Sequence, residues 1–110
     1  MDTYEKIKDA ISEFGLNVRY SRKQIESIVK RKYGNMEVIP SDYCYNRVNN
    51  GIDLQKNLAE KRCLFIYEGR NAYVFVGSRY NYEGEFKHKP KGEKEYVAGL
   101  IKNGRVVWQK

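Results

Sequence analysis

The stretch from Ile39 to Gly51 holds the side chains best suited to reading hydrogen-bonding edges. It runs Ile-Pro-Ser-Asp-Tyr-Cys-Tyr-Asn-Arg-Val-Asn-Asn-Gly. Asn can bond adenine through two hydrogen bonds and Arg can do the same for guanine, so an exposed face of amides beside one guanidinium favours contact with base edges. The residues predicted to contact bases on this ground are Asn46, Arg47, Asn49 and Asn50, and Tyr45 beside them is predicted to contact the nucleic acid as well.

Basic side chains before and after this stretch have the charge needed to hold phosphates. Residues 19–32 carry six Lys or Arg against one Glu, and a second basic run, Lys-His-Lys-Pro-Lys, covers residues 87–91. The whole chain has a net charge of +7, which favours polyanionic partners and nucleic acid first among them. The predicted phosphate contacts are Arg22, Lys23, Lys30, Arg31, Lys87, Lys89 and Lys91.

Two catalytic hypotheses have less support in the sequence than the binding hypothesis has. Glu85 and Lys87 form an acid-x-Lys pattern with Asp53 upstream, as in nucleases that bind Mg²⁺. Such short matches arise readily in a chain that is 32% charged. A Cys44–His88 pair lacks any sign of a thiolate, and two Cys with one His are too few for a structural zinc site. We therefore expect a protein that is not an enzyme and needs no metal or cofactor.

The first half of the chain predicts helices. Over residues 3–14, Tyr4, Ile7, Ile11 and Phe14 form one apolar stripe, and a glycine follows. Ser21 and the Gln three residues later have capping-box spacing and open a second helix that ends at Gly34. Between these two helices, residues 16–20 alternate apolar and polar, which indicates a short extended segment.

A third helix is predicted within the stretch from Ile39 to Gly51. Pro40 and Ser41 are typical of a helix start, and Asn50-Gly51 is typical of an end. Cys44 and Val48, four residues apart, would face inward together. The connector over residues 35–40 is longer than the turn of a strict helix-turn-helix.

The second half of the chain predicts antiparallel hairpins. Residues 63–67 and 72–76 are β-branched and aromatic runs around a four-residue turn. Residues 77–92 are polar and contain Pro90, so we expect a long exposed loop. Two further strands flank Asn103-Gly104, and Trp108 in the last of them is predicted to lie in the core.

This order of elements predicts an α+β fold in one domain over residues 1–110. A helical part (residues 1–51) would precede an antiparallel β part (residues 62–110), as in a winged helix-turn-helix. In that architecture the third helix enters the major groove and the basic loop lies along the backbone. The predicted function is non-catalytic nucleic-acid binding, with DNA favoured over RNA.

Three stretches also carry a family resemblance: residues 40–49, Tyr80-Asn-Tyr-Glu-Gly84 and His88-Lys-Pro-Lys-Gly92. Together they resemble a small bacterial domain of unknown function that occurs alone or joined to nuclease-like domains of restriction or mobile-element type. The resemblance implies a nucleic-acid context and a nuclease or other protein as a partner. It assigns no reaction and no catalytic residue.

Other interpretations stay open. Four tyrosines could form an aromatic patch for a protein partner or stack on single-stranded nucleic acid: Tyr43, Tyr45, Tyr80 and Tyr82. Alternatively, the Tyr and Asn side chains of residues 43–50 are internal struts. No apolar run approaches the ~20 residues of a membrane helix, and the start of the chain lacks the pattern of a signal peptide. We expect a cytoplasmic location and no membrane partner.

Overall fold

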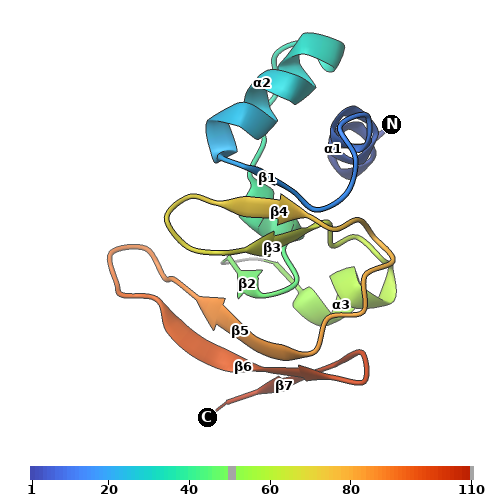
Figure 1. Ribbon diagram of the computed structural model, residues 1–110. Helices are drawn as coiled ribbons and strands as arrows, with labels where there is room; N and C mark the ends of the chain where they lie inside the picture. The colour runs from blue at the N-terminus through green and yellow to red at the C-terminus, as the bar shows by residue number, and fades with distance from the viewer. Residues whose placement is uncertain (50–51, 110) are drawn as a thin grey trace.

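The computed structural model describes residues 1–49 and 52–109 (Figure 1). Within them the chain forms three α-helices, one 3₁₀ turn and seven strands. In chain order these are α1 (Thr3–Ser12), β1 (Val18–Tyr20), α2 (Arg22–Tyr33), η1 (Pro40–Tyr43), β2 (Arg47–Val48), α3 (Leu54–Ala59), β3 (Phe65–Tyr67), β4 (Tyr73–Phe75), β5 (Gly84–His88), β6 (Tyr96–Lys102) and β7 (Arg105–Trp108). No helix of these residues is long and apolar enough to span a membrane.

The strands form two sheets. The first has the order β1-β4-β3 and is antiparallel throughout. The second has the order β2-β5-β6-β7, with β2 parallel to β5 and the other pairs antiparallel. Helices α1 and α2 lie together beside the first sheet, and α3 lies beside the second (Figure 1). The fold is α+β, with more strands than helices.

Both long helices begin with a capping box, and the one on the second helix was expected from the sequence. Asp2 and Glu5 form a capping box on α1, and Ser21 and Gln24 form one on α2. Gly34 ends α2 with a φ of +83°, a conformation that glycine adopts without strain. The second helix is therefore confirmed almost to the residue, whereas α1 ends at Ser12.

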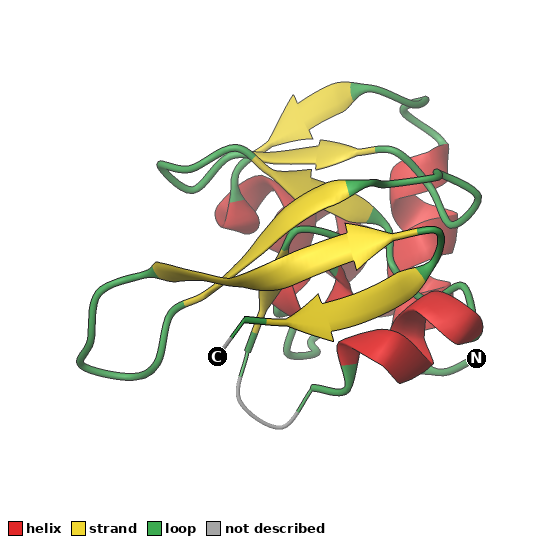
Figure 2. Cartoon of the chain, turned by 90° about the horizontal axis from the view of Figure 1, so that it is seen from below, coloured by secondary structure: helices red, strands yellow, loops and turns green. Residues whose placement is uncertain are grey.

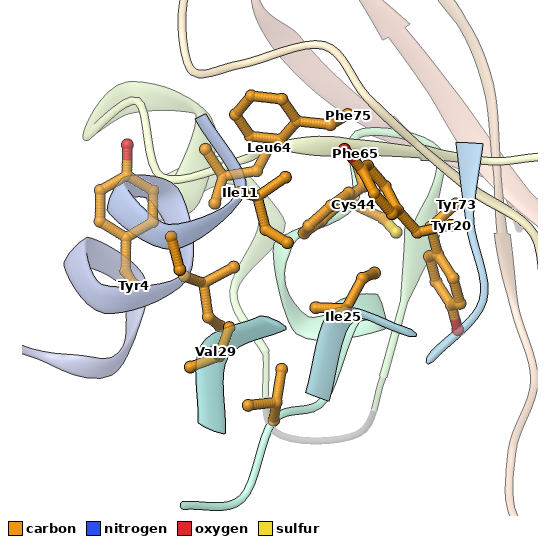
Figure 3. Packing of buried hydrophobic residues seen from close by; sticks show 13 residues of the cluster. Tyr4, Ile11, Tyr20, Ile25, Val29, Cys44, Leu64, Phe65, Tyr73 and Phe75 are labelled. Carbon is orange, nitrogen blue, oxygen red and sulfur yellow. The ribbon is translucent and has the colours of Figure 1, made fainter. Parts of the chain in front are cut away.

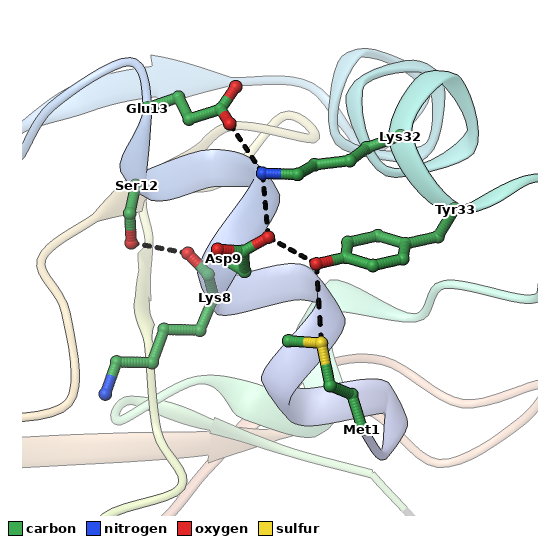
Figure 4. Close-up of polar contacts among 7 residues, drawn as sticks. All are labelled: Met1, Lys8, Asp9, Ser12, Glu13, Lys32 and Tyr33. Atoms are coloured by element: carbon green, nitrogen blue, oxygen red, sulfur yellow. Dashed lines mark hydrogen bonds and ion pairs between the residues drawn. The ribbon is translucent and has the colours of Figure 1, made fainter.

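A polar cluster joins α1 to α2 (Figure 4). Lys32 pairs with Asp9 at 2.8 Å and with Glu13 at 2.5 Å, and the Tyr33 hydroxyl donates to Asp9. The Lys32 ammonium lowers the pKa of Asp9, and the hydrogen bond from Tyr33 adds to this effect. These side chains are partly exposed, so the cluster orients the helices and adds little to stability.

The larger core lies between α1, α2 and the first sheet (Figure 3). Ile11 from α1 and Ile25 and Val29 from α2 are fully buried against Phe65 and Phe75. Full burial of such a side chain stabilises the fold by about 1.5–3 kcal/mol. Phe14, predicted to extend the stripe of α1, lies beyond the end of that helix and is half exposed.

A second, smaller core lies between the second sheet and α3. Phe86 and Ile101 from the sheet meet Leu54 from α3, and Tyr45 and Val48 belong to the same cluster. This core contains the middle of the stretch that was predicted to be a recognition helix. The segment therefore connects the two sheets instead of standing on the surface.

The prediction of a helix within the stretch from Ile39 to Gly51 is wrong, and the winged helix-turn-helix that depended on it is wrong as well. After the single turn of η1, Cys44 is already extended, with φ −91° and ψ 146°. The Tyr45 N–H donates to Phe65 O at 2.9 Å and the Leu64 N–H donates to Tyr43 O at 2.6 Å. This pairing beside β3 satisfies backbone groups that a helix would have satisfied locally, and Tyr and Cys in alternation suit an extended chain.

Residues 1–51, predicted to be mainly helical, contain two strands: β1 lies in the short extended segment expected at residues 16–20, whereas β2 was not expected. Residues 77–92 are not one long loop, since Gly84 to His88 form β5 in the interior of the second sheet. Pro90 does not prevent this, because it lies beyond the last residue of the strand. Trp108 was also predicted wrongly: it is 55% exposed, and its ring packs against Phe86 at the edge of the core.

Candidate nucleic-acid interface

Asn46 faces the edge of the first sheet, not solvent. Its Nδ2 donates to Tyr67 O at 2.7 Å, and its Oδ1 accepts from the Tyr67 N–H at 2.8 Å. Tyr67 belongs to β3, the outer strand of that sheet. The amide thus takes the place of a neighbouring strand and satisfies both backbone groups of one residue. Both polar atoms of the amide are thus already engaged inside the fold.

Tyr45 and Asn49 are also used internally. Tyr45 is 3% exposed, and its hydroxyl donates to Gly77 O at 2.8 Å. Asn49 Nδ2 lies 2.6 Å from Ser41 Oγ and 2.8 Å from Asp42 Oδ1. Both side chains connect their segment to its surroundings. Asn50, the remaining amide predicted to contact bases, lies outside the described residues.

Arg47 is held between two elements. Its guanidinium lies over the Tyr67 ring, 4.1 Å from the ring centre, and its Nε is 3.4 Å from Glu95 Oε2. The side chain is only 14% exposed. The prediction that Tyr45, Asn46, Arg47 and Asn49 form an exposed recognition face is therefore wrong. Tyr45, Asn46 and Asn49 form hydrogen bonds to Gly77, Tyr67 and the η1 turn, and Arg47 forms an ion pair with Glu95.

The structural role of Asn46 predicts a loss of stability on substitution. Asn46→Ala leaves the N–H and carbonyl of Tyr67 without their partner, so we expect the free energy of unfolding to fall by about 2 kcal/mol. Urea unfolding measures this change. Asn81→Ala is the matched control, because Asn81 is exposed and its side chain forms no hydrogen bond within the described residues. The control should stay within about 0.5 kcal/mol of the unsubstituted protein. An Asn46→Ala protein of unchanged stability would contradict the assigned contacts.

Most of the predicted phosphate contacts are exposed and unengaged. Among the described residues, six of the seven form no ion pair; Arg22, which pairs with Glu26 at 2.8 Å, is the exception. The six are Lys23, Lys30, Arg31, Lys87, Lys89 and Lys91. Because these lysines and arginines are exposed and form no ion pair, they can bind a phosphate without first breaking an ion pair inside the fold.

The structure brings only part of this set to one side of the molecule. The β3–β4 turn and the β5–β6 loop project in the same direction (Figures 1 and 2). The N-terminal end of α2 adjoins the first of them, because the Arg22 N–H donates to Asn71 Oδ1 at 3.1 Å. Lys30 and Arg31 lie in the last turn of α2, at the end directed away from the β5–β6 loop (Figure 1).

We call this side of the molecule the cationic side. It comprises Lys23, Arg70, Lys87, Lys89, Lys91 and Lys94, none of which has an ion-pair partner in the described chain. The neighbouring acids are mostly engaged: Glu26 with Arg22, Glu68 with Arg19 at 2.7 Å, and Glu95 with Arg47. Glu93 is the remaining acid of the β5–β6 loop, and it has no such partner in the described residues. The cationic side therefore has a strong local excess of positive charge.

Sequence reasoning missed Arg70 and Lys94. Lys94 follows the basic run but stands between two glutamates, which hides its contribution from a count of charge along the chain. One of those glutamates, Glu95, is taken up by Arg47. Arg70 lies in the β3–β4 turn, and only the arrangement of the two sheets places that turn on the same side as the β5–β6 loop. No signal in the sequence indicates that arrangement.

Of the acids in the nuclease alternative, Asp53 has a structural role, because it caps α3 by accepting from the Lys56 N–H at 3.0 Å. Burial raises the pKa of the Cys44 thiol well above its usual value and that of Cys63 to about 12. Both thiols are therefore protonated at neutral pH and poor nucleophiles. Within the described residues, no three His, Cys, Asp or Glu side chains are grouped to hold a metal ion.

Comparison with known proteins gives a family but no function. Residues 2–108 match the family described as "Domain of unknown function (DUF7225)". The chain is 38% identical over 107 residues to the uncharacterized protein YnaC of Bacillus subtilis (strain 168). The alignment covers 94% of this chain and 38% of that relative, so the chain spans well under half of the relative's length. No solved structure matches the chain significantly.

Proposed function

The chain belongs to the DUF7225 family of domains of unknown function, and we propose that it is a non-catalytic nucleic-acid-binding domain. One observation carries this proposal: the cationic side presents six cations that form no ion pair within the described chain. Lysines and arginines on projecting loops can follow a phosphate backbone, and the release of counterions from the nucleic acid drives such binding. Duplex DNA is the favoured partner, because a duplex has a higher charge density than a single strand.

The proposed contacts are with phosphates and not with bases. Phosphate contacts position a protein on nucleic acid but carry no sequence information. The side-chain amides of Asn46 and Asn49, which were predicted to contact adenine, form hydrogen bonds inside the fold instead. The domain would therefore bind with little preference for sequence, in contrast to a groove-reading helix.

Equal affinity for unrelated sequences is the expected result that tests this proposal. Fluorescence anisotropy at ~50 mM salt, with two labelled duplexes of equal length and different base composition, should give dissociation constants within about threefold of each other. A specific protein would separate such sequences by about 10³-fold or more. No binding to either duplex would remove the proposal. A large preference for one duplex would show that base readers exist outside the cationic side.

The wider context belongs to the same proposal. The sequence resemblance implies nuclease-like domains of restriction or mobile-element type as partners, and YnaC is long enough to hold further domains. In such an arrangement this domain would hold the nucleic acid and another unit would act on it. A cytoplasmic setting fits the two cysteines, which are both free thiols.

A protein-interaction role is the second candidate, and the second sheet favours it. Leu100 and Val107 lie opposite each other on β6 and β7 and are 49% and 55% exposed. The aromatic patch predicted from the sequence is not present as such, because Tyr45 is buried and Tyr43 is partly buried. Binding through the apolar pair would survive ~1 M salt, whereas phosphate binding would not.

A further inference from the structure

A cavity of about 490 Å³ opens in the second half of the chain, between α3, the β4–β5 connection and the β6–β7 turn. These three elements lie on the side of the molecule opposite the β5–β6 loop (Figure 1). The cavity is therefore separate from the cationic side. Its volume is within the range of about 300–1,000 Å³ that is typical of small-ligand sites.

Tyrosine rings form one wall of this cavity. Tyr45 lies at its base, and the rings of Tyr80 and Tyr82 pack against it with centres 5.7 and 6.3 Å away. The hydroxyls of Tyr45 and Tyr82 are fixed by the carbonyls of Gly77 and Glu85. Tyr80 is different, because 47% of its surface is exposed. Its ring packs edge-on against Tyr45 and lines the cavity while staying half exposed.

The opposite wall is rigid as well. Gln55 on α3 donates to Gly104 O at 3.2 Å and accepts from the Val106 N–H at 2.8 Å. The two hydrogen bonds fasten the β6–β7 turn to the helix. A ligand entering here would meet walls that are already in place, which lowers the conformational cost of binding.

The charge of the lining is one-sided. No Asp or Glu contributes to it, although the chain has 14 of them, while Lys61 and Arg79 both do. Neither cation has an ion-pair partner in the described part of the chain. Asn57 and Asn81 add amide groups. The cavity thus combines an exposed aromatic ring, two available cations and hydrogen-bonding side chains.

We propose that this cavity binds a nucleotide, with the base against Tyr80 and the phosphate held by Arg79 and Lys61. An aromatic ring stacks on any base, and cations at the rim suit a phosphate that stays partly in water. The nucleotide has two sources, a free mononucleotide or an unpaired nucleotide at the end of a strand. This proposal does not depend on the cationic side, and either can fail without the other.

The test is a titration of the full chain with adenosine 5′-monophosphate and with adenosine, followed by two-dimensional NMR of the backbone amides. The monophosphate is expected to shift signals of residues 78–82, and adenosine is expected to bind at least fivefold more weakly. Tyr80→Ala should weaken binding of the monophosphate about 5- to 100-fold, in line with the loss of one stacked base. Tyr80→Phe keeps the ring and should bind within about twofold of the unsubstituted protein.

Charge variants complete the test. Arg79→Gln should weaken the monophosphate at least threefold and leave adenosine unchanged, whereas Arg70→Gln, on the cationic side, should change neither. Saturable binding of the monophosphate assigns a free nucleotide. Binding only of a duplex with an unpaired end, in preference to a blunt duplex, assigns a strand end. Absence of both, or binding that both Tyr80→Ala and Arg79→Gln leave unchanged, overturns the proposal.

Discussion

Replacing Lys87, Lys89, Lys91 and Lys94 together with Gln is expected to lower the affinity for duplex DNA by about 10²- to 10³-fold at ~0.1 M salt. All four side chains are exposed, and no ion pair of the described chain holds them. Each phosphate contact contributes about 0.9 to the slope of log K against log salt, which near ~0.1 M salt is close to tenfold in affinity. If three or four of these lysines contact phosphates, the slope of log K against log salt becomes shallower by about 3.

A matched variant distinguishes the effect of where the charges lie from the effect of the total charge. Lys6, Lys8, Lys56 and Lys102 are also exposed or partly exposed, and they lie in α1, α3 and β6, outside the cationic side. Changing these four to Gln removes the same net charge and should lower the affinity only a few-fold. Equal losses for the two variants would mean that binding follows the overall charge of the protein and not the cationic side.

Gly99→Ala is expected to destabilise the protein by about 3 kcal/mol, the upper end of the usual cost of overpacking. Gly99 lies in β6 between Phe86 of β5 and Trp108 of β7. A Cβ at this position would be 2.2 Å from Val107 O and 2.8 Å from the Phe86 ring. The carbonyl belongs to the backbone of the paired strand, so relief requires β7 to move away from β6. That movement would weaken the strand pairing and the contact between Trp108 and Phe86.

Gly92→Ala is the control for this effect. Gly92 has a φ of +80°, and a Cβ there would meet no atom within 4 Å. Its substitution should cost only the strain of a left-handed residue, about 1 kcal/mol. Urea unfolding of both variants measures the difference. A Gly99→Ala protein no less stable than Gly92→Ala would show that the close contact of β6 and β7 is misplaced.

Several elements, though not their arrangement, could be predicted from local sequence signals. The capping box at Ser21, the glycine stop at Gly34 and the Asn103-Gly104 turn all act within a few residues, and each lies where it was expected. The hairpin of β3 and β4 follows from its β-branched and aromatic runs in the same way. These signals are strong because the interactions behind them form between residues that are close together in the chain.

The stretch from Ile39 to Asn49 shows where such reasoning fails. Its helix-start signal is real but yields only the single turn of η1. Beyond it, pairing with β3 decides the conformation, and β3 lies some 20 residues further along the chain. Asn46 was expected to be exposed because a helix with Cys44 and Val48 facing inward would turn it to solvent. Instead it completes the edge of a sheet that could not be assembled from the sequence.

The candidate site divides in a similar way. The lysines around residue 89 could be predicted, because a basic run with a proline indicates a projecting segment on its own. Lys30 and Arg31 were grouped with them by charge alone, and the direction of α2 separates them. The cavity beside Tyr80 draws its lining from residues 45–104. Only the packing of α3 against the β6–β7 turn brings those residues together.

The salt dependence of duplex binding tests the central claim most directly. If the six cations of the cationic side contact phosphates, a plot of log K against log salt has a slope of about −5. The measurement uses the unsubstituted protein between ~20 and ~200 mM salt. A slope between about −4 and −6 is the predicted result. A slope near zero, or no duplex binding at ~20 mM salt, would contradict the claim that this domain binds nucleic acid through its cationic side.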